Sequence, residues 1–383
     1  MRIVLVGPAH PFRGGIAQHT ACLYRALQAR HEVLLISFSR QYPGIFFPGR
    51  SQHDESGYVL RVPNLPLLDS LDPRSWRRTG TTVRQWKPDV LVFQWWQPFF
   101  GPAYRTVARK VRGSGCRILF VCHNVFAHRE FSVVGSRLVE KRLARAAFRY
   151  GDGFLVQAQT LARALRELGI RAPIEMVSHP LYDFFQEWDE PGEPADRSER
   201  AVPTLLFFGN IRPYKGLDIF LRALARLKDA MPFRAIVAGD FYMDPRPYRR
   251  LTEELGLQDH VVWRDGYVPN EEVPRLFRSA DLVVLPYIEA TQSGVVPVAY
   301  LFDVPVIASD VGGLSEVVFE GRTGLLVPPG DPVRLAERIL EYFRENRRER
   351  FRENIQAVRR ELTWDRVVEA LERLALHAGG GGA

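Results

Sequence analysis

Short apolar runs alternate along the chain with longer stretches in which apolar residues recur every three or four positions. Runs such as RIVLVG at residues 2–7 and DLVVLP at 281–286 have the length of a buried strand. The stretch 217–227 has leucines and a phenylalanine at helical spacing, which predicts an amphipathic helix. Because such strands and helices alternate, the sequence predicts an α/β protein with parallel, doubly wound sheets.

The alternation is interrupted between residues 183 and 203 by a segment rich in acidic residues, proline and glycine. This composition is typical of a linker, so we predict domains at 1–182 and 204–362. A chain of 383 residues is long enough for two hydrophobic cores. Two local predictions accompany this division: a strand at Tyr58–Val62 and a helix capped by Asn270.

The stretch LLFFGNIRPYKGLD at residues 205–218 predicts a strand, a tight loop and a helix. Arg212 and Lys215 fall where this helix begins, which is unfavourable for cations because a helix start carries partial positive charge. A bound anion would explain their position. A guanidinium, an ammonium and backbone N–H groups together suit a phosphate or diphosphate, whereas the alternative is that both side chains are solvated.

Candidate binding residues of the first half lie where two predicted strands end. A pair of glycines, of which Gly15 is the second, precedes the first helix and lets backbone N–H groups approach a ligand closely; a plain turn is the alternative. The strand RILFVCHN ends in His123 and Asn124, at the edge where open α/β sheets bind ligands. A structural histidine is the alternative there, and His128 and Glu130 are further candidates for the polar role.

An aromatic run, QWWQPFF, follows the predicted strand at residues 89–93. Trp95 and Trp96, together with the neighbouring amide side chains, suit stacking on a sugar ring or contact with a lipid chain. The alternative is an apolar cluster inside the domain. We therefore treat both tryptophans, with Asn124, as candidate acceptor-binding residues.

The net charge of +8 conceals a difference between the two halves of the chain. Residues 1–180 hold 26 basic against 11 acidic side chains, whereas the remainder holds 26 against 33. A predicted helix at 136–150 carries a basic residue every four positions, and Leu138 is among the apolar residues expected to pack on the domain. This helix suits an anionic membrane surface, or it presents a solvated face. The four basic residues are Arg137, Lys141, Arg145 and Arg149.

Several classes of protein are disfavoured by composition. Three cysteines without CxxC spacing indicate neither a zinc site nor a disulfide framework, and fit a reducing cytoplasm. No apolar run approaches the roughly 18 residues that span a bilayer, and the N-terminus lacks the apolar core of a signal peptide. No nucleic-acid-binding motif accompanies the basic charge, so we expect no nucleic-acid partner.

Together these motifs resemble the retaining GT-B glycosyltransferases of family 4 type, which transfer a sugar from a nucleotide-sugar donor. The resemblance covers nearly the whole chain and rests on five pieces in order: GGIAQH, VCHN, FGNIRPYKG, IEATQSGVVPVAY followed by DVPVIASDVGG, and GRTGLLVPPGD. It implies a GT-B architecture, with two Rossmann-like domains that face an interdomain cleft. It also implies that a last helix, 363–376, packs back on the first domain.

The resemblance also implies roles for individual residues. Arg212 and Lys215 would neutralise the donor diphosphate, and His123 would lie beside the transferred sugar. Glu289 corresponds, with a shift of one position, to the first of two family glutamates; the second falls on Val298 and is missing. The catalytic candidates are Arg212, Lys215, His123 and Glu289. The donor-binding candidates are Gly15, Gly209, Tyr267, Ser293, Gly294 and Val295.

The resulting hypothesis is a cytoplasmic enzyme that moves a sugar from a nucleotide-diphosphate donor to a glycan or lipid-linked acceptor with retention of configuration. No cofactor and no metal are expected, because cations and helix ends stabilise the leaving group, and the sequence contains no DxD motif. Peripheral association with the inner face of the cell membrane is expected from the basic helix. The alternative is a noncatalytic module that binds a nucleotide sugar or a membrane.

Overall fold

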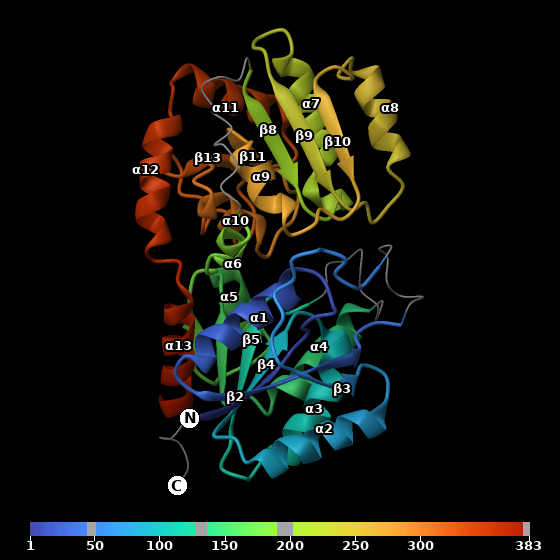
Figure 1. The fold of residues 1–383 in the computed structure, drawn as a ribbon, viewed down its shortest axis with the longest axis vertical. Coiled ribbons are helices and arrows are strands. Elements are labelled where there is room, and N and C mark those ends of the chain that lie inside the picture. The colour runs from blue at the N-terminus through green and yellow to red at the C-terminus, as the bar shows by residue number, and fades with distance from the viewer. Residues whose placement is uncertain (44–50, 127–135, 190–201, 378–383) are drawn as a thin grey trace. The chain divides into compact units, whose positions relative to one another are not determined.

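The computed structural model describes residues 1–43, 51–126, 136–189 and 202–377. The chain divides into two compact units, which we treat separately (Figure 1). The first comprises Met1–Asp54, Leu60–Ser178 and Thr363–Ala383, and the second comprises Glu55–Val59 and His179–Leu362.

The first unit contains a seven-stranded parallel sheet in the order β3-β2-β1-β4-β5-β6-β7. Its strands are β1 (Arg2–Val6), β2 (Glu32–Arg40), β3 (Leu65–Asp69), β4 (Val90–Trp95), β5 (Arg117–Cys122), β6 (Gly153–Val156) and β7 (Ile174–Met176). Its helices are α1 (Gly15–Gln28), α2 (Pro73–Trp86), α3 (Gly101–Val111), α4 (Arg137–Phe148), α5 (Gln159–Glu167) and α13 (Trp364–His377), with a 3-10 turn at Pro98–Phe100.

The second unit contains a six-stranded parallel sheet in the order β10-β9-β8-β11-β12-β13. Its strands are β8 (Thr204–Phe208), β9 (Arg234–Gly239), β10 (Val261–Asp265), β11 (Leu282–Leu285), β12 (Val306–Ser309) and β13 (Gly324–Val327). Its helices are α6 (Phe184–Glu187), α7 (Leu217–Leu227), α8 (Arg246–Glu254), α9 (Glu272–Arg278), α10 (Val295–Leu301), α11 (Pro332–Arg344) and α12 (Arg348–Arg359), with a 3-10 turn at Pro213–Lys215.

Parallel sheets form here because their central strands are apolar on both faces. All six residues of β4 and all four residues of β11 are buried, as expected for strands covered by helices on each side. Each unit has its own apolar core built from such strands and their crossover helices. The prediction of two doubly wound, Rossmann-like parallel sheets is therefore confirmed.

The last helix, α13, packs in the first unit against α1, β5, β6 and β7, although the second unit precedes it in the chain. Arg30 forms an ion pair of 3.1 Å with Asp365, and the Nε2 of His31 lies 2.9 Å from a carboxylate oxygen of Glu372. These contacts join the first turn and the middle of α13 to the turn between α1 and β2. Apolar packing adds to them, since Val367, Val368 and Leu371 are buried.

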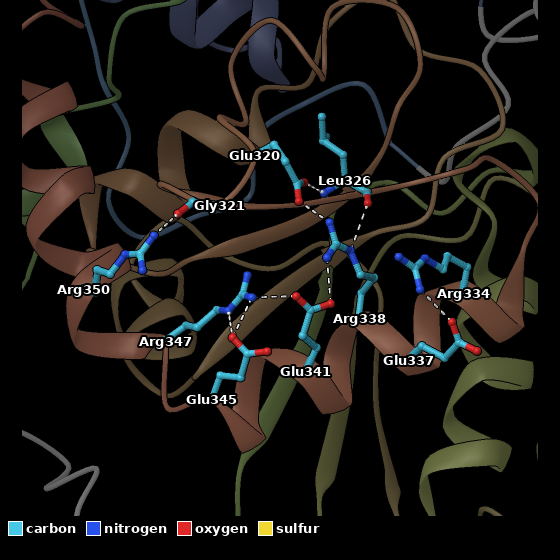
Figure 2. Close-up of polar contacts among 10 residues, drawn as sticks. All are labelled: Glu320, Gly321, Leu326, Arg334, Glu337, Arg338, Glu341, Glu345, Arg347 and Arg350. Atoms are coloured by element: carbon cyan, nitrogen blue, oxygen red, sulfur yellow. Dashed lines mark hydrogen bonds and ion pairs between the residues drawn. The ribbon is translucent and has the colours of Figure 1, made fainter.

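In the second unit, alternating arginines and glutamates connect α11 and α12 to the turn before β13 (Figure 2). Arg338 forms ion pairs with Glu320 and, at 2.7 Å, with Glu341. Arg347 lies 2.6 Å from Glu341 and 2.7 Å from Glu345. The network keeps many of the charged side chains of these two helices in ion pairs. We therefore interpret it as a stabilising contact between the elements and not as a binding site.

Two local predictions are wrong, a strand at Tyr58–Val62 and a cap at Asn270. Tyr58–Val62 is not a strand; the edge strand is β3, where Pro66 is tolerated because an edge position needs no N–H donor on its outer side. In the predicted linker, 183–203, the described residues include α6, whose Phe184 and Phe185 are buried. Residues 190–201 lie outside the described residues. Asn270 does not cap α9, since its amide nitrogen donates to the Tyr58 carbonyl at 3.0 Å.

Candidate functional site

The loop after β8 lies at the point of the second sheet where the strand order reverses. β8 pairs with β9 on one side and with β11 on the other, and open α/β sheets bind ligands at the carboxyl edge of such a point. Gly209 and Gly216 bound the loop with φ of 101° and 68°, a backbone conformation that favours glycine. A Cβ atom on Gly216 would lie 2.0 Å from the carbonyl oxygen of Pro286, so the backbone here packs too closely for a side chain.

Lys215 is a buried cation on this loop, with 8% of the residue exposed. Its Nζ lies 5.4 Å from the centroid of the Tyr287 ring, and a Cβ on Gly209 would approach Nζ to 3.0 Å. Among the residues that the structure describes, no carboxylate forms an ion pair with Lys215. Burial, and secondarily the positive charge of Arg212, lower the pKa of Lys215 to about 7.

Arg212 is half-buried at the start of the same loop, with its guanidinium carbon 4.6 Å from the centroid of the Tyr242 ring. The aromatic face supports the cation without neutralising it, because the ring carries no net charge. Arg212 and Lys215 thus add two positive charges at one strand end, which is the arrangement that a phosphate or diphosphate needs.

The loop between β11 and α10 borders the same place. Val295, the first residue of α10, has its Cγ2 3.7 Å from the position that a Cβ of Gly209 would take. The Oγ of Ser293 accepts from the Val295 N–H at 3.2 Å and lies 3.5 Å from the Tyr287 hydroxyl. Gly294 is exposed beside them. The structure therefore brings four donor-binding candidates together around Lys215.

Glu289 is exposed on the same loop, and no contact to Arg212 or Lys215 is present among the described residues. The backbone next to Glu289 packs closely on another loop: a Cβ on Gly312 would lie 1.6 Å from the carbonyl oxygen of Ala290, the residue that follows Glu289. The loop therefore rests on the backbone near Gly312, while the Glu289 carboxylate is left in solvent.

Tyr267 lies in the loop after β10 and is half-buried. Its hydroxyl is 3.4 Å from Asn270 Oδ1 and 3.5 Å from the Ser56 Oγ. The segment 55–59 is joined to this loop by further bonds, including one of 3.0 Å from the Gly57 N–H to a Glu271 carboxylate oxygen. These contacts give the Tyr267 ring a supported position, which the sequence did not indicate.

In the first unit, Gly15 and His123 lie at the carboxyl edge of the sheet. Gly15 is exposed and begins α1, preceded by Gly14 with φ of 104°. His123 follows β5 and is buried, and its Nε2 lies 2.6 Å from Gln94 Oε1. Asn124 is half-buried beside it. His128 and Glu130 lie outside the described residues.

The assignment of Trp95 and Trp96 to acceptor binding is wrong. Trp95 is fully buried, packs against Phe148 with ring centroids 4.4 Å apart, and its Nε1 donates to the Val125 carbonyl at 3.3 Å. Trp96 belongs to the same core and donates to the Tyr42 hydroxyl at 2.8 Å. Their indole N–H groups are satisfied inside the domain, so the aromatic run builds the core.

The four basic residues predicted to face a membrane are all exposed; Arg137, Lys141 and Arg145 lie on α4, and Arg149 follows its last residue. Arg137 pairs with the buried Glu140 at 3.1 Å, and Arg145 donates to the Leu168 carbonyl at 3.1 Å. Leu138 does not pack on the domain as predicted, because 59% of it is exposed. The buried face of α4 instead consists of Glu140, Ala144, Ala147 and Phe148.

Neither a membrane-spanning helix nor a cluster of metal ligands is present among the described residues. Every helix in them is too short or too polar to span a lipid bilayer. His, Cys, Asp and Glu side chains nowhere gather in threes at distances that suit a metal ion.

Two family models match the chain. Residues 13–181 match the model described as Glycosyltransferase Family 4, and residues 202–345 match Glycosyl transferases group 1. The chain belongs to the GT-B glycosyltransferases. Solved structures of this fold resemble it over nearly its whole length. A glycosyltransferase from Rickettsia africae has a TM-score of 0.74 at 16% identity and covers 100% of this chain and 99% of that one.

A second solved structure, that of Anabaena HepE in complex with UDP, has a TM-score of 0.72 at 19% identity and covers 97% of this chain and 100% of HepE. Among curated relatives, the D-inositol 3-phosphate glycosyltransferase of Corynebacterium glutamicum is 35% identical over 36% of this chain and 35% of its own length. The chain thus spans about a third of that glycosyltransferase. The 2-deoxystreptamine glucosyltransferase of Streptomyces kanamyceticus is 26% identical over 82% of this chain and 84% of its own length.

Three residues near His123 were missed by sequence reasoning: His19, Gln94 and Gln157. Each is polar and fully or almost fully buried. The available signal was their position, because the two glutamines end the strands VLVFQ and GFLVQ and the histidine lies in the first helix after the paired glycines.

Proposed function

We propose that this protein is a glycosyltransferase that moves a sugar from a nucleotide-diphosphate donor to an acceptor, with Arg212 and Lys215 holding the diphosphate. Buried cations are expected to be paired, and Lys215 has no ion pair among the described residues. A site that leaves such a cation unneutralised favours an anionic ligand. This observation carries the proposal.

Catalysis in this scheme is largely electrostatic. As the bond between sugar and diphosphate breaks, negative charge grows on the leaving diphosphate, and Arg212 and Lys215 stabilise it in a place with little water. Backbone N–H groups near Ser293 and Val295 add to this stabilisation. Two fixed cations supply the charge that a divalent ion supplies in other sites, so we propose a metal-independent transfer with retention of configuration.

The remaining candidate residues are assigned to the base, a phosphate and the sugar of the donor. Tyr267 is proposed beside the base, and Gly15 beside a donor phosphate. His123 and Glu289 are proposed beside the transferred sugar. The similarity to HepE, whose structures contain UDP and UDP-glucose, supports a nucleoside-diphosphate sugar as donor.

For the acceptor we propose a hydroxyl-bearing glycan or a lipid-linked intermediate, with Asn124 among the residues that contact it. The named relatives act on an inositol phosphate and on 2-deoxystreptamine, which are hydroxylated rings. That likeness supports a polyhydroxylated acceptor without selecting one.

The test is binding and turnover with a panel of UDP-, ADP- and GDP-sugars, followed by substitution of the two cations. Lys215→Ala and Arg212→Ala should each lower turnover on the order of a hundredfold, by analogy with removal of one donor to a developing charge. Lys228→Met is the matched control, since its Nζ donates to the Leu255 carbonyl in the same unit, away from the loop. Unchanged turnover in both loop variants would refute the assignment. Donor binding without hydrolysis or transfer would instead indicate a noncatalytic module.

We also propose peripheral association with an anionic membrane surface through α4. At roughly 100° of rotation per residue, Leu138 projects between Arg145 and Arg149 on the exposed side of the helix. An exposed leucine among cations suits insertion into the boundary of a negatively charged bilayer. A cytoplasmic enzyme on the inner membrane face would then meet a lipid-linked acceptor.

Pelleting of the protein with vesicles of phosphatidylglycerol and phosphatidylcholine tests the proposed membrane association. Lys141→Glu combined with Arg149→Glu should reduce pelleting and Leu138→Ser should weaken it further, whereas Arg222→Glu, at an exposed position of α7, should not. Equal pelleting of all variants would argue for a soluble acceptor.

A further inference from the structure

Tyr287 is a buried tyrosine that lies beside both loops of the candidate site. It closely follows β11, as the loop of Lys215 follows β8, and these two strands are neighbours in the second sheet. Only 2% of the residue is exposed, and its hydroxyl lies 3.5 Å from the Oγ of Ser293. A buried polar ring at the edge where open α/β sheets bind ligands suggests a role beyond packing.

The ring of Tyr287 meets the cation of the site with its face. The Nζ of Lys215 lies over this ring, 5.4 Å from the centroid. Within about 6 Å the partial negative charge of a ring face attracts a cation, and the attraction is stronger where water is excluded. Lys215 is in such a place, because 8% of it is exposed. The backbone of Gly209 also approaches Nζ closely, since a Cβ there would lie 3.0 Å from it. The ring and this backbone together hold the ammonium.

Tyr287 is itself fixed to the loop that follows β8. The Ile288 N–H donates to the Tyr214 carbonyl at 2.7 Å, and a Cβ on Gly216 would lie 2.0 Å from the carbonyl oxygen of Pro286. The ring of Tyr214 meets the ring of Tyr287 edge to face, with centroids 6.1 Å apart. The backbone on both sides of Tyr287 is therefore in contact with this loop, so the ring has a defined position under the cation.

A neutral ring suits this position better than a carboxylate would. A carboxylate beside Lys215 would form an ion pair with it and compete with an incoming diphosphate for the ammonium. An aromatic ring attracts the cation but carries no net charge, so the ammonium keeps its charge for the ligand. Burial, and secondarily the charge of Arg212, lower the pKa of Lys215, whereas the attraction of the ring acts in the opposite direction. The ring thus offsets part of what desolvation costs the charged form.

We propose that Tyr287 is a positioning residue whose ring face keeps the Lys215 ammonium oriented and charged for the donor diphosphate. The proposal deepens the proposed function and rests on the place given there to Lys215. The ring acts through Lys215 alone, so a weaker ring face should change the titration of Lys215 and should have no effect on donor binding once Lys215 is replaced by methionine.

The first readout uses the full chain and does not depend on activity. Tyr287→Phe is compared with Tyr287→3,4,5-trifluorophenylalanine, because the two rings have nearly the same shape while fluorine withdraws negative charge from the ring face. Carbon-13 NMR of the lysine ε positions, with Lys215 assigned through Lys215→Met, gives its titration midpoint in a chain that has only five lysines. The midpoint should be lower by about half a pH unit or more in the fluorinated protein. Equal midpoints, or a higher one in the fluorinated protein, would overturn the proposal.

The second readout is affinity at pH 8 for the nucleotide sugar that the wild type binds. Half a pH unit corresponds to about threefold weaker binding in the fluorinated protein, and in a Lys215→Met background the two rings should bind equally. The same pair of rings at Tyr300 is the matched control and should leave the Lys215 midpoint unchanged, since this buried tyrosine donates to the Val317 carbonyl at 3.0 Å.

The outcomes separate this proposal from the proposed function. If the wild type binds no nucleotide sugar, the proposed function fails, and the two Lys215 midpoints still decide the role of Tyr287. An equal loss of affinity in the Lys215→Met background would show a merely structural role and would overturn the proposal.

Discussion

Affinity for a nucleotide sugar is predicted to fall about tenfold for each pH unit above 7. Lys215 has a pKa of about 7 in the ligand-free protein, so about half of it is charged at pH 7 and about a tenth at pH 8. A bound diphosphate favours the charged form and raises this pKa towards its ordinary range. Above pH 7 binding must therefore take up a proton, and each pH unit lowers the binding free energy by about 1.4 kcal/mol.

Isothermal titration calorimetry measures both the affinity at each pH and the number of protons taken up on binding. At pH 8, titrations in two buffers of different ionisation enthalpy should show uptake of about 0.9 proton per ligand. A nucleotide sugar is the correct probe because its diphosphate is fully esterified, whereas a terminal phosphate has a second pKa near 6. Neighbouring Tyr287 does not interfere, because burial raises its pKa and its hydroxyl stays neutral in this range.

Two substitutions isolate Lys215 as the source of the slope. Lys215→Arg should bind with little pH dependence between 7 and 9, because a guanidinium stays protonated throughout. Lys228→Met should keep the wild-type slope. A wild-type affinity that is constant between pH 7 and 9, or an equal slope in Lys215→Arg, would refute the reasoning.

Three further predictions concern stability. Because the folded pKa of Lys215 is below its unfolded value of about 10.4, the charged lysine destabilises the folded state fully below pH 7 and no longer above about 10.4. Lys215→Met should thus raise the free energy of unfolding by up to about 5 kcal/mol at pH 6 and by far less at pH 10.5. Urea denaturation measures this difference, and a lower free energy of unfolding at pH 6 would contradict the prediction. Gly312→Ala should cost more than about 2 kcal/mol, because its Cβ would lie 1.6 Å from the Ala290 carbonyl oxygen, whereas Gly330→Ala, with open space and φ of 77°, should cost about 1 kcal/mol; equal losses would argue against the overlap. Trp95→Ala should cost about 3–5 kcal/mol in thermal unfolding and leave the acceptor KM of the folded fraction unchanged; a raised KM would restore its binding role.

The fold was largely predictable from the sequence because its strands are apolar on both faces. Runs such as LLFF at 205–208 and LVVL at 282–285 admit few other structures between helical stretches. The strand at the sheet edge was not predictable in the same way. β3 contains Pro66 and exposed residues, so its pattern resembles a loop, and only pairing with β2 identifies it.

The site was predictable where local backbone chemistry defines it. The loop of Arg212 and Lys215 is fixed by nearby glycines and a proline, and its two cations are only three positions apart in the sequence. The cluster of buried polar side chains near His123 was not predictable, because His19, Gln94 and Gln157 are far apart in the chain and meet only through the sheet order. Trp95 was misassigned for a related reason. Adjacent residues of a strand face opposite sides, and the sequence does not state that α4 covers the tryptophan while Gln94 faces α1.

Burial of Lys215 opposes folding and favours binding for one physical reason. Water is removed from the ammonium when the chain folds, so a diphosphate that arrives later meets a cation already dehydrated and oriented. Restoring the pKa from about 7 to its ordinary value is worth up to about 5 kcal/mol, which sets the largest contribution that this one charge makes to binding or to the transition state. A hundredfold loss of turnover in Lys215→Ala corresponds to about 3 kcal/mol and lies within that limit. The free energy of turnover lost in Lys215→Ala should therefore not exceed the stability gained in Lys215→Met at pH 6, since the same unneutralised charge limits both.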